Sequence, residues 1–319
     1  MTGRAAASGS EGPDCALFTA FLLSLTVPKS LPMNRFLLAA LLLLSGLRPA
    51  LAQRLVSQTA TLAAGQGVFL DLKFAHNIRV RAGAGLSVQA HVSINDNQDN
   101  DLYSLGLQTT DSELSVVEKL DEDKLRETHY TGDCDGGSRS NSSGGLQAGY
   151  TRSSKTGGLR PTLSHHKAGY SYCLKIDYDV TVPAGTTLRL NTISGDLDLS
   201  GLNGAVTAKT ISGDVLSAGL TGPLTLRTVS GDMKLTDLGH SVVEATSVSG
   251  DVDVSWPSAV GADLRLKTIS GEVYADPAVT FSNLKARAYV GYELHGNLGS
   301  GGPLVTLHSV SGDVFFRKQ

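Results

Sequence analysis

A tripeptide that returns at nearly constant intervals constrains this chain more than any other feature. Ser-Gly-Asp occurs five times between residues 194 and 313, Ser270-Gly271-Glu272 is a conservative variant, and Gly291-Tyr292-Glu293 is a degenerate copy that keeps the acid. The central residues of successive copies are 18 to 21 residues apart. An even period near 20 residues in a segment rich in Thr, Ser and Val is typical of an all-β solenoid, in which each repeat forms one coil.

Apolar residues recur at fixed positions within each repeat. Two residues before the central position the chain has Ile193, Ile211, Val229, Val248, Ile269, Val290 and Val310. Two residues after it stand Leu197, Val215, Met233, Val252, Val273, Leu294 and Val314. Because alternating apolar residues indicate half-buried strands, we predict that both columns face inward and form a narrow core, with the Gly in the same phase. The apolar residues five and seven positions before the Gly are out of phase with the first column, so we expect a corner or bulge in between.

Three polar columns are predicted to face outward. The first is Thr192, Thr210, Thr228, Ser247 and Thr268; the second is Ser194, Ser212, Ser230, Ser249 and Ser270; the third is Asp196, Asp214, Asp232, Asp251, Glu272, Glu293 and Asp313. Stacked strands lie about 4.8 Å apart, so each column becomes a row of hydroxyls or carboxylates. Like charges at this spacing repel by about 1 kcal/mol even in water, and we expect other contacts to offset that repulsion.

Two explanations of the acidic column remain open. Each carboxylate could accept hydrogen bonds from Ser hydroxyls or from backbone N–H groups at a bend. Alternatively, the column could collect cations such as Ca2+ or bind a hydroxyl-rich polymer. A Ca2+ ion takes six to eight oxygen ligands and Ser-Gly-Asp supplies few, so we assign no cofactor, no metal site and no catalytic residue.

The lead-in Val182-Pro183-Ala184-Gly185, followed by Leu-x-Leu-x-Thr-Ile-Ser-Gly-Asp-Leu-x-Leu and its recurrences, resembles a bacterial family of provisionally named adhesins. The resemblance covers residues 174–319 strongly and residues 60–120 weakly. It implies an exported β-solenoid domain of unknown function with Ser-Gly-Asp repeats, and it implies no catalytic residues. By analogy we expect a right-handed, single-stranded β-helix of about seven coils, one for each copy of the repeat.

The remaining sequence divides into further segments. Residues 33–52 contain Arg35, an apolar run and Ala50-Leu51-Ala52, which is the pattern of a secretory signal peptide. We therefore expect residues 1–32 to be a mis-assigned upstream segment, and a longer, unusual leader is the alternative. The product is expected to be exported (periplasmic, cell-surface or secreted), with no membrane span in the mature chain.

Strand-like alternation over 67–81, 86–94, 102–107 and 114–117 predicts an N-terminal β-section over 53–120 that caps the solenoid. Residues 121–173 are polar and rich in Gly and Ser, and we expect them to form a loop insertion. A further strand is expected over 174–182, at the start of the repeat domain 174–319.

Cys134 and Cys173 are the two cysteines that follow the expected cleavage site. In an oxidising compartment such a pair favours one disulfide across the Gly- and Ser-rich segment. A metal site that combines them with His129, His165 and His166 is the alternative, although the spacing matches no standard zinc pattern.

The repeats favour a non-catalytic adhesion or scaffold module. A repetitive outer face suits a cell-surface or polymeric ligand, such as a glycan. The formal net charge of −3 argues against a nucleic-acid partner. Short turns and the lack of a nucleophile–base pair argue against an enzyme of the β-helical polysaccharide lyase kind. An envelope-stress sensing or regulatory domain is a further alternative, and the oligomeric state is left open.

Overall fold

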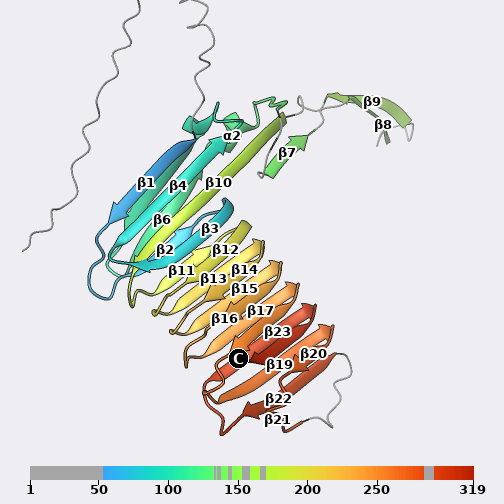
Figure 1. Cartoon of the computed structure of the whole chain (residues 1–319). Coiled ribbons are helices and arrows are strands. Elements are labelled where there is room, and N and C mark those ends of the chain that lie inside the picture. Colours follow the sequence, from blue (N-terminus) through green and yellow to red (C-terminus); the bar gives the residue numbers. More distant parts are fainter. Residues whose placement is uncertain are drawn as a thin grey trace, which may run out of the picture. The chain divides into compact units, whose positions relative to one another are not determined.

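Two mixed β-sheets hold most of the regular structure in the computed structural model (Figure 1). The structure describes residues 53–132, 134, 138–142, 146–152, 159–165, 170–283 and 291–319. Sheet A has the spatial order β1 (Arg54–Ala60), β4 (Leu86–Ile94), β10 (Tyr170–Pro183), β3 (Phe74–Gly83), β12 (Ser194–Ser200), β14 (Val215–Ala218), β16 (Met233–Thr236), β18 (Val252–Trp256), β24 (Val314–Lys318) and β20 (Val273–Ala275), with β7 (Ser138–Ser142) beside β10.

Sheet B lies across the core from sheet A. Its spatial order is β21 (Val279–Phe281), β22 (Tyr292–Leu298), β19 (Ala262–Ser270), β23 (Leu304–Ser311), β17 (Val243–Ser249), β15 (Leu224–Ser230), β13 (Val206–Ser212), β11 (Leu188–Asn191), β2 (Gly67–Asp71), β6 (Glu113–Leu120) and β5 (Tyr103–Thr109). A two-stranded sheet of β8 (Leu146–Arg152) and β9 (Leu159–His165), the short helix α2 (Glu122–Leu125) and the 3-10 turn η1 (Asn100–Leu102) complete the described elements.

Each repeat contributes one strand to each sheet and pairs in parallel with the repeat beside it. Val206 of β13 lies opposite Leu224 of β15, and Val215 of β14 lies opposite Met233 of β16. Strands β2 and β3 form an additional first coil, because β2 pairs with β11 and β3 pairs with β12. The all-β, solenoid-like architecture is therefore the one that the repeat period predicts, and it begins before the first Ser-Gly-Asp.

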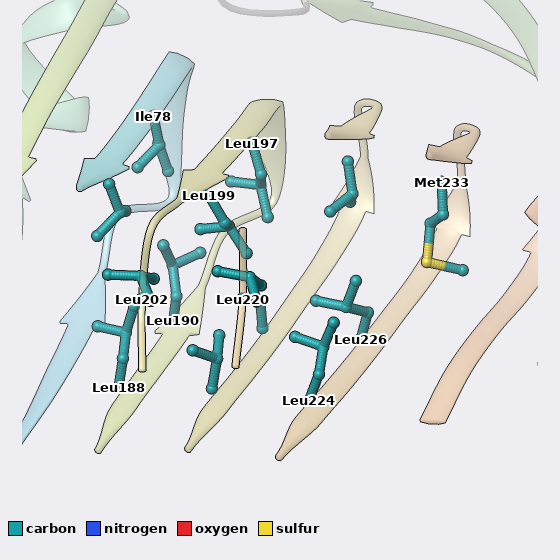
Figure 2. Packing of buried hydrophobic residues seen from close by; sticks show 14 of the residues in the cluster. Ile78, Leu188, Leu190, Leu197, Leu199, Leu202, Leu220, Leu224, Leu226 and Met233 are labelled. Carbon is teal, nitrogen blue, oxygen red and sulfur yellow. The ribbon is translucent and has the colours of Figure 1, made fainter. Parts of the chain in front are cut away.

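The core is a narrow layer of aliphatic side chains between the two sheets. Figure 2 shows Leu188, Leu190, Leu224 and Leu226 of sheet B with Leu197, Leu199 and Met233 of sheet A. Leu202 and Leu220, which are also buried, follow the sheet A strands and lie in the turns that lead to the next coil. The predicted inward column two residues after the Gly is confirmed at Leu197, Val215, Met233, Val252 and Val314.

The predicted column two residues before the Gly is wrong in its phase. Ile193, Ile211, Val229, Val248 and Ile269 are 40–51% exposed and Val310 is half-buried, whereas Thr210 and the other members of the Thr column are buried. Val290 lies outside the described residues. The reason is that alternation continues unbroken along β13, where Val206, Ala208 and Thr210 all face inward. The chain then bends at Gly213 and Asp214, so the corner coincides with the tripeptide instead of preceding it. We call this bend the Ser-Gly-Asp corner.

The coils do not stack in the order of the sequence. The last coil, formed by β23 and β24, lies between the coil of β17 and β18 and the coil of β19 and β20. The expected degenerate copy at Gly291 is not a coil, because β22 returns antiparallel to β19. The C-terminal repeat is thus an internal layer of the stack.

The N-terminal strands predicted from alternation are present. Residues 67–81 form two strands, β2 and β3, and the other four predicted segments correspond to β4, β5, β6 and β10. Residues 121–173, expected to be a loop, contain α2, β7, β8 and β9. The expected signal peptide lies outside the described residues. Among the residues that are described, no helix has both the length and the hydropathy of a membrane span.

Candidate binding face at the Ser-Gly-Asp corner

The glycine of each repeat is required by the closeness of neighbouring coils. Gly213 and Gly231 have φ angles of 130° and 133°, which side-chain-bearing residues rarely adopt. A Cβ atom on Gly231 would lie 2.2 Å from the carbonyl oxygen of Gly213 in the next coil. Close approach of the main chains therefore sets the geometry of the corner.

The acids after these glycines form a hydrogen-bonded row along the stack. In spatial order the acidic row is Asp196, Asp214, Asp232, Asp251, Asp313 and Glu272. In each step Oδ1 of one acid accepts a hydrogen bond from the backbone N–H of the next acid, at 2.7 to 2.9 Å. At the last step the Tyr274 hydroxyl donates to Oε2 of Glu272 at 2.7 Å.

This arrangement corresponds to the first of the two explanations offered for the acidic column. A backbone N–H donor at each carboxylate offsets the repulsion between neighbouring charges, because a hydrogen bond to an ionised acceptor is stronger than a neutral one. Within the described ranges, no group of three or more His, Cys, Asp or Glu side chains has a geometry that could hold a metal ion. The Oδ2 atom of each internal acid takes no part in these bonds between coils.

Glu293 does not belong to this row, contrary to the sequence-based prediction. It lies on β22 opposite Lys267 of β19, with 3.9 Å between Oε2 and the Lys267 Nζ atom. Its Oε1 atom is 3.3 Å from Nε2 of His295. The antiparallel return of β22 places this acid on the outer surface of sheet B, away from the corner.

The two hydroxyl columns have different environments. Ser212, Ser230, Ser249 and Ser270 are exposed at the corner, and Ser194 is half-buried, its Oγ atom donating to the Ala75 carbonyl at 3.2 Å. The Thr column was predicted to face outward and is instead internal. The Oγ1 atom of Thr210 donates to the Ser212 carbonyl at 3.1 Å, and Thr228 makes the same contact with Ser230. Thr192 donates in the same way to the Ser194 carbonyl, whereas Thr268 donates to the Gly312 carbonyl of the neighbouring coil at 2.8 Å. Among the described residues, the buried Ser247 hydroxyl has no hydrogen-bond partner.

A row of exposed aliphatic side chains runs beside the Ser row. In spatial order this aliphatic row is Ile193, Ile211, Val229, Val248, Val310 and Ile269, with Val310 half-buried. Five of the ten large hydrophobic side chains that are exposed in the described part of the chain belong to it. Contiguous exposed apolar surface rimmed by polar residues is a mark of an interaction site. We call the aliphatic, Ser and acidic rows together the corner face.

Sequence reasoning missed this feature because the aliphatic residues were assigned to the core. The signal that could have revealed it is the Thr at the preceding position. An unbroken alternation through Leu224, Leu226 and Thr228 leaves Val229 outside.

Basic residues flank the aliphatic row on the side away from the acids. Lys209, Arg227 and Lys267 stand two residues before aliphatic-row members and are exposed on the outer face of sheet B; we call them the basic row. Arg227 also pairs with Glu244, with 2.8 Å between Nη2 and Oε1. His308 occupies the same position in the coil of β23 and β24, which we call the inserted coil; burial and then the charge of Lys267 lower the pKa of His308.

The two cysteines precede the corner repeats in the chain. Cys134 and Cys173 form a disulfide with their Cα atoms 5.6 Å apart. The bond links the segment after α2 to β10, the strand that pairs with both β3 and β4 in sheet A. It therefore fastens the segment between them to the N-terminal part of sheet A.

Comparison with known proteins gives one family and a distant structural likeness. The model of the family described as Toastrack DUF4097 matches residues 98–316. No curated protein matches the chain. A solved structure from Clostridium sporogenes, provisionally described as a cell adhesion protein, is 10% identical, with a TM-score of 0.42, over 84% of this chain and 100% of its own. A likeness at that level transfers no function.

Proposed function

The chain belongs to the Toastrack family DUF4097, and from that premise we propose that it is an exported, non-catalytic adhesion or scaffold module. It binds a cell-surface or polymeric ligand through the corner face. The observation that carries this proposal is the aliphatic row, which stays exposed in coil after coil although each of its members could have been polar.

The corner face suits a ligand that is itself repetitive. Each coil presents an aliphatic side chain, a Ser hydroxyl and a carboxylate, and the set returns about every 4.8 Å along the stack. A polymer whose units carry hydroxyl groups could donate to the outer carboxylate oxygens while its apolar parts cover the aliphatic row. Many weak, equivalent contacts then add up along one chain.

The acids of the corner face are equivalent to one another. Asp214, Asp232 and Asp251 each accept a hydrogen bond from the backbone N–H of the next acid in the row. Such repetition favours a binding surface, in which every coil makes the same contact, over a catalytic site, in which two groups take different roles.

Binding of the purified chain to cells and to immobilised polysaccharides tests the proposal. The variant combines Ile211→Thr with Val229→Thr, which keeps β-branched side chains on the strands and removes apolar surface from the corner face. We expect at least about a tenfold loss of binding, since two such contacts contribute on the order of 1.4 kcal/mol or more. The matched control is Leu216→Thr, because Leu216 is 52% exposed but lies on the outer face of β14. Equal binding by the double variant and the control would contradict the proposal.

A further inference from the structure

The corner face carries charges of opposite sign on its two sides. Lys209 precedes Ile211 by two residues on the outer face of β13, and Asp214 follows Ile211 by three residues, beyond the bend. Arg227, Val229 and Asp232 repeat this order in the next coil. Across the stack, the aliphatic row therefore separates a basic row from an acidic row.

We propose that the corner face binds the corner face of a second copy of this chain, with the two stacks parallel and related by a two-fold axis along the aliphatic row. This inference rests on the proposed function, and it names the occupant of the same face. In this arrangement the aliphatic rows cover each other, and each basic row lies against the acidic row of the second copy.

The charge pattern selects the direction of pairing. A two-fold axis along the row exchanges its two sides, so Lys209 meets Asp214 of the second copy and Arg227 meets Asp232 of the second copy. A two-fold axis across the row would instead place acid against acid, which costs free energy. Long Lys and Arg side chains can reach across the aliphatic row while their stems lie on apolar surface.

A second copy also matches the spacing of the face without adjustment. The aliphatic and acidic rows repeat at the distance between paired strands, so every coil meets the equivalent coil of the other chain. An isologous contact of this kind closes after two chains, which is the commonest symmetry among soluble oligomers. The aliphatic row spans six coils, or about 24 Å at the usual strand spacing.

The mass of the purified chain in solution, measured by sedimentation equilibrium over a wide concentration range, tests the pairing. We expect a reversible dimer. The Ile211→Thr, Val229→Thr double variant should raise the dimer dissociation constant at least about tenfold, while Leu216→Thr leaves it unchanged. Lys209→Glu should weaken the dimer as well, because it places two new carboxylates against Asp214 residues. A monomer at all concentrations, or equal weakening by Leu216→Thr, overturns the inference.

Single cysteines at the two ends of the row test its direction. Ile193→Cys and Ile269→Cys lie in the first and last coils of the row and are exposed. With parallel stacks, each variant forms a covalent dimer with itself under mild oxidation, whereas the unmodified chain does not. Crosslinks that form only when the two variants are mixed would show antiparallel pairing and overturn the proposed symmetry.

The two proposals fail in different ways. If the chain is monomeric but the double variant still loses binding to cells or polysaccharides, the second copy is the wrong occupant and the binding face stands. If the chain dimerises through the row but the double variant binds cells and polysaccharides normally, the proposed adhesion function fails and the dimer stands.

Discussion

Oδ1 of Asp214 accepts a hydrogen bond from the backbone N–H of Asp232, one coil along the stack, at 2.8 Å. The same bond joins Asp232 to Asp251, and it passes through the inserted coil from Asp251 to Asp313. At the bend the Asp232 carbonyl accepts a hydrogen bond from the backbone N–H of Val215. The backbone N–H of Asp232 is paired with a side chain instead, so the Asp214 carboxylate supplies the acceptor that this N–H needs. The acidic row thus closes the corner, and the proposed function uses the carboxylate oxygens that take no part in these bonds.

The first prediction concerns the charge of this row. Asp214→Asn combined with Asp232→Asn keeps the Oδ1 acceptors and removes two neighbouring charges, so the free energy of unfolding should change by less than about 0.5 kcal/mol. Asp214→Ala, which removes the acceptor, should cost about 0.5–1.5 kcal/mol. Millimolar Ca2+ should not raise the melting temperature of the unmodified chain. A Ca2+-dependent rise that the Asn variant abolishes would assign the row to cation binding instead.

The second prediction concerns the glycine of the corner. Gly231→Ala should lower the free energy of unfolding by more than about 2 kcal/mol, because φ is positive and the new Cβ meets a carbonyl oxygen. Gly219→Ala is the control: its φ is also positive, at 68°, but its nearest atom would be 3.6 Å away. It should cost about 1 kcal/mol from backbone conformation alone. Equal losses in urea denaturation would show that coil-to-coil contact is not what requires Gly231.

The third prediction separates two adjacent residues. Thr228 is 3% exposed and Val229 is 48% exposed. Thr228→Asp buries a charge without a partner and should cost several kcal/mol, on the order of 3 or more, whereas Val229→Asp should cost less than about 1 kcal/mol. Thermal denaturation of the two variants tests which of the two residues, Thr228 or Val229, faces the core. The opposite ranking would restore the sequence-based expectation that Val229 is internal.

Only part of the corner could be predicted from the sequence. The inward residue two positions after the Gly, such as Val215, was predicted correctly, whereas the bend was expected before the tripeptide and lies at the positive-φ glycine itself. Which residues face the core before the bend could not be predicted from apolarity alone, because Ile211 is more apolar than Thr210 and yet is the exposed one of the two. The buried Thr is tolerated only because its hydroxyl finds the Ser212 carbonyl, which is a contact of the folded coil.

The order in which the coils stack could also not be predicted from the sequence. Strands β19 and β23 carry nearly the same apolar pattern, so either could pair with β17 in the same register. The choice depends on how β21 and β22 close the end of sheet B, which repeat spacing does not encode. The aliphatic row therefore became recognisable as a surface only once the strands were in place.

The fourth prediction concerns pH. Glu118 of β6 is 8% exposed, and its Oε2 atom accepts the Phe74 N–H at 2.9 Å. Burial raises the pKa of Glu118 from 4.5 to about 7, the Phe74 hydrogen bond opposes that rise, and the charge of Asp71 adds to it. The hydroxyls of Tyr103 and Tyr178, 2.9 Å apart, are the buried neighbours of this carboxyl group.

Because the folded-state pKa of Glu118 is raised, the fold favours the protonated form. The contribution of this group to the free energy of unfolding is full below pH 4.5 and is lost as the pH rises through about 7, a change on the order of 3 kcal/mol. Glu118→Gln should flatten the dependence of unfolding free energy on pH in this window and stabilise the chain at pH 8. Urea denaturation between pH 4.5 and pH 8 measures it. A parallel pH dependence in the Gln variant would assign the titration to another group.

The last prediction follows from the inserted coil. Removal of residues 304–319 takes away β23 and β24, which pair with strands on both sides in each sheet. In a stack that followed the sequence, such a truncation would fray only the end. Here it separates β17 and β18 from β19 and β20, so residues 262–283 should lose protection from hydrogen exchange.

Residues 67–71 and 188–212 lie on the far side of the stack and should keep most of their protection, because their strands pair with one another and with β6. The matched control removes Gln319 alone, which breaks one backbone bond to the Trp256 carbonyl and leaves both strands of the inserted coil intact. If residues 262–283 remained protected after the longer truncation, β19 would have moved to pair with β17 directly. The similar repeats of the two strands would then make the inserted coil replaceable, and the observed order would be only one of two stable stacks.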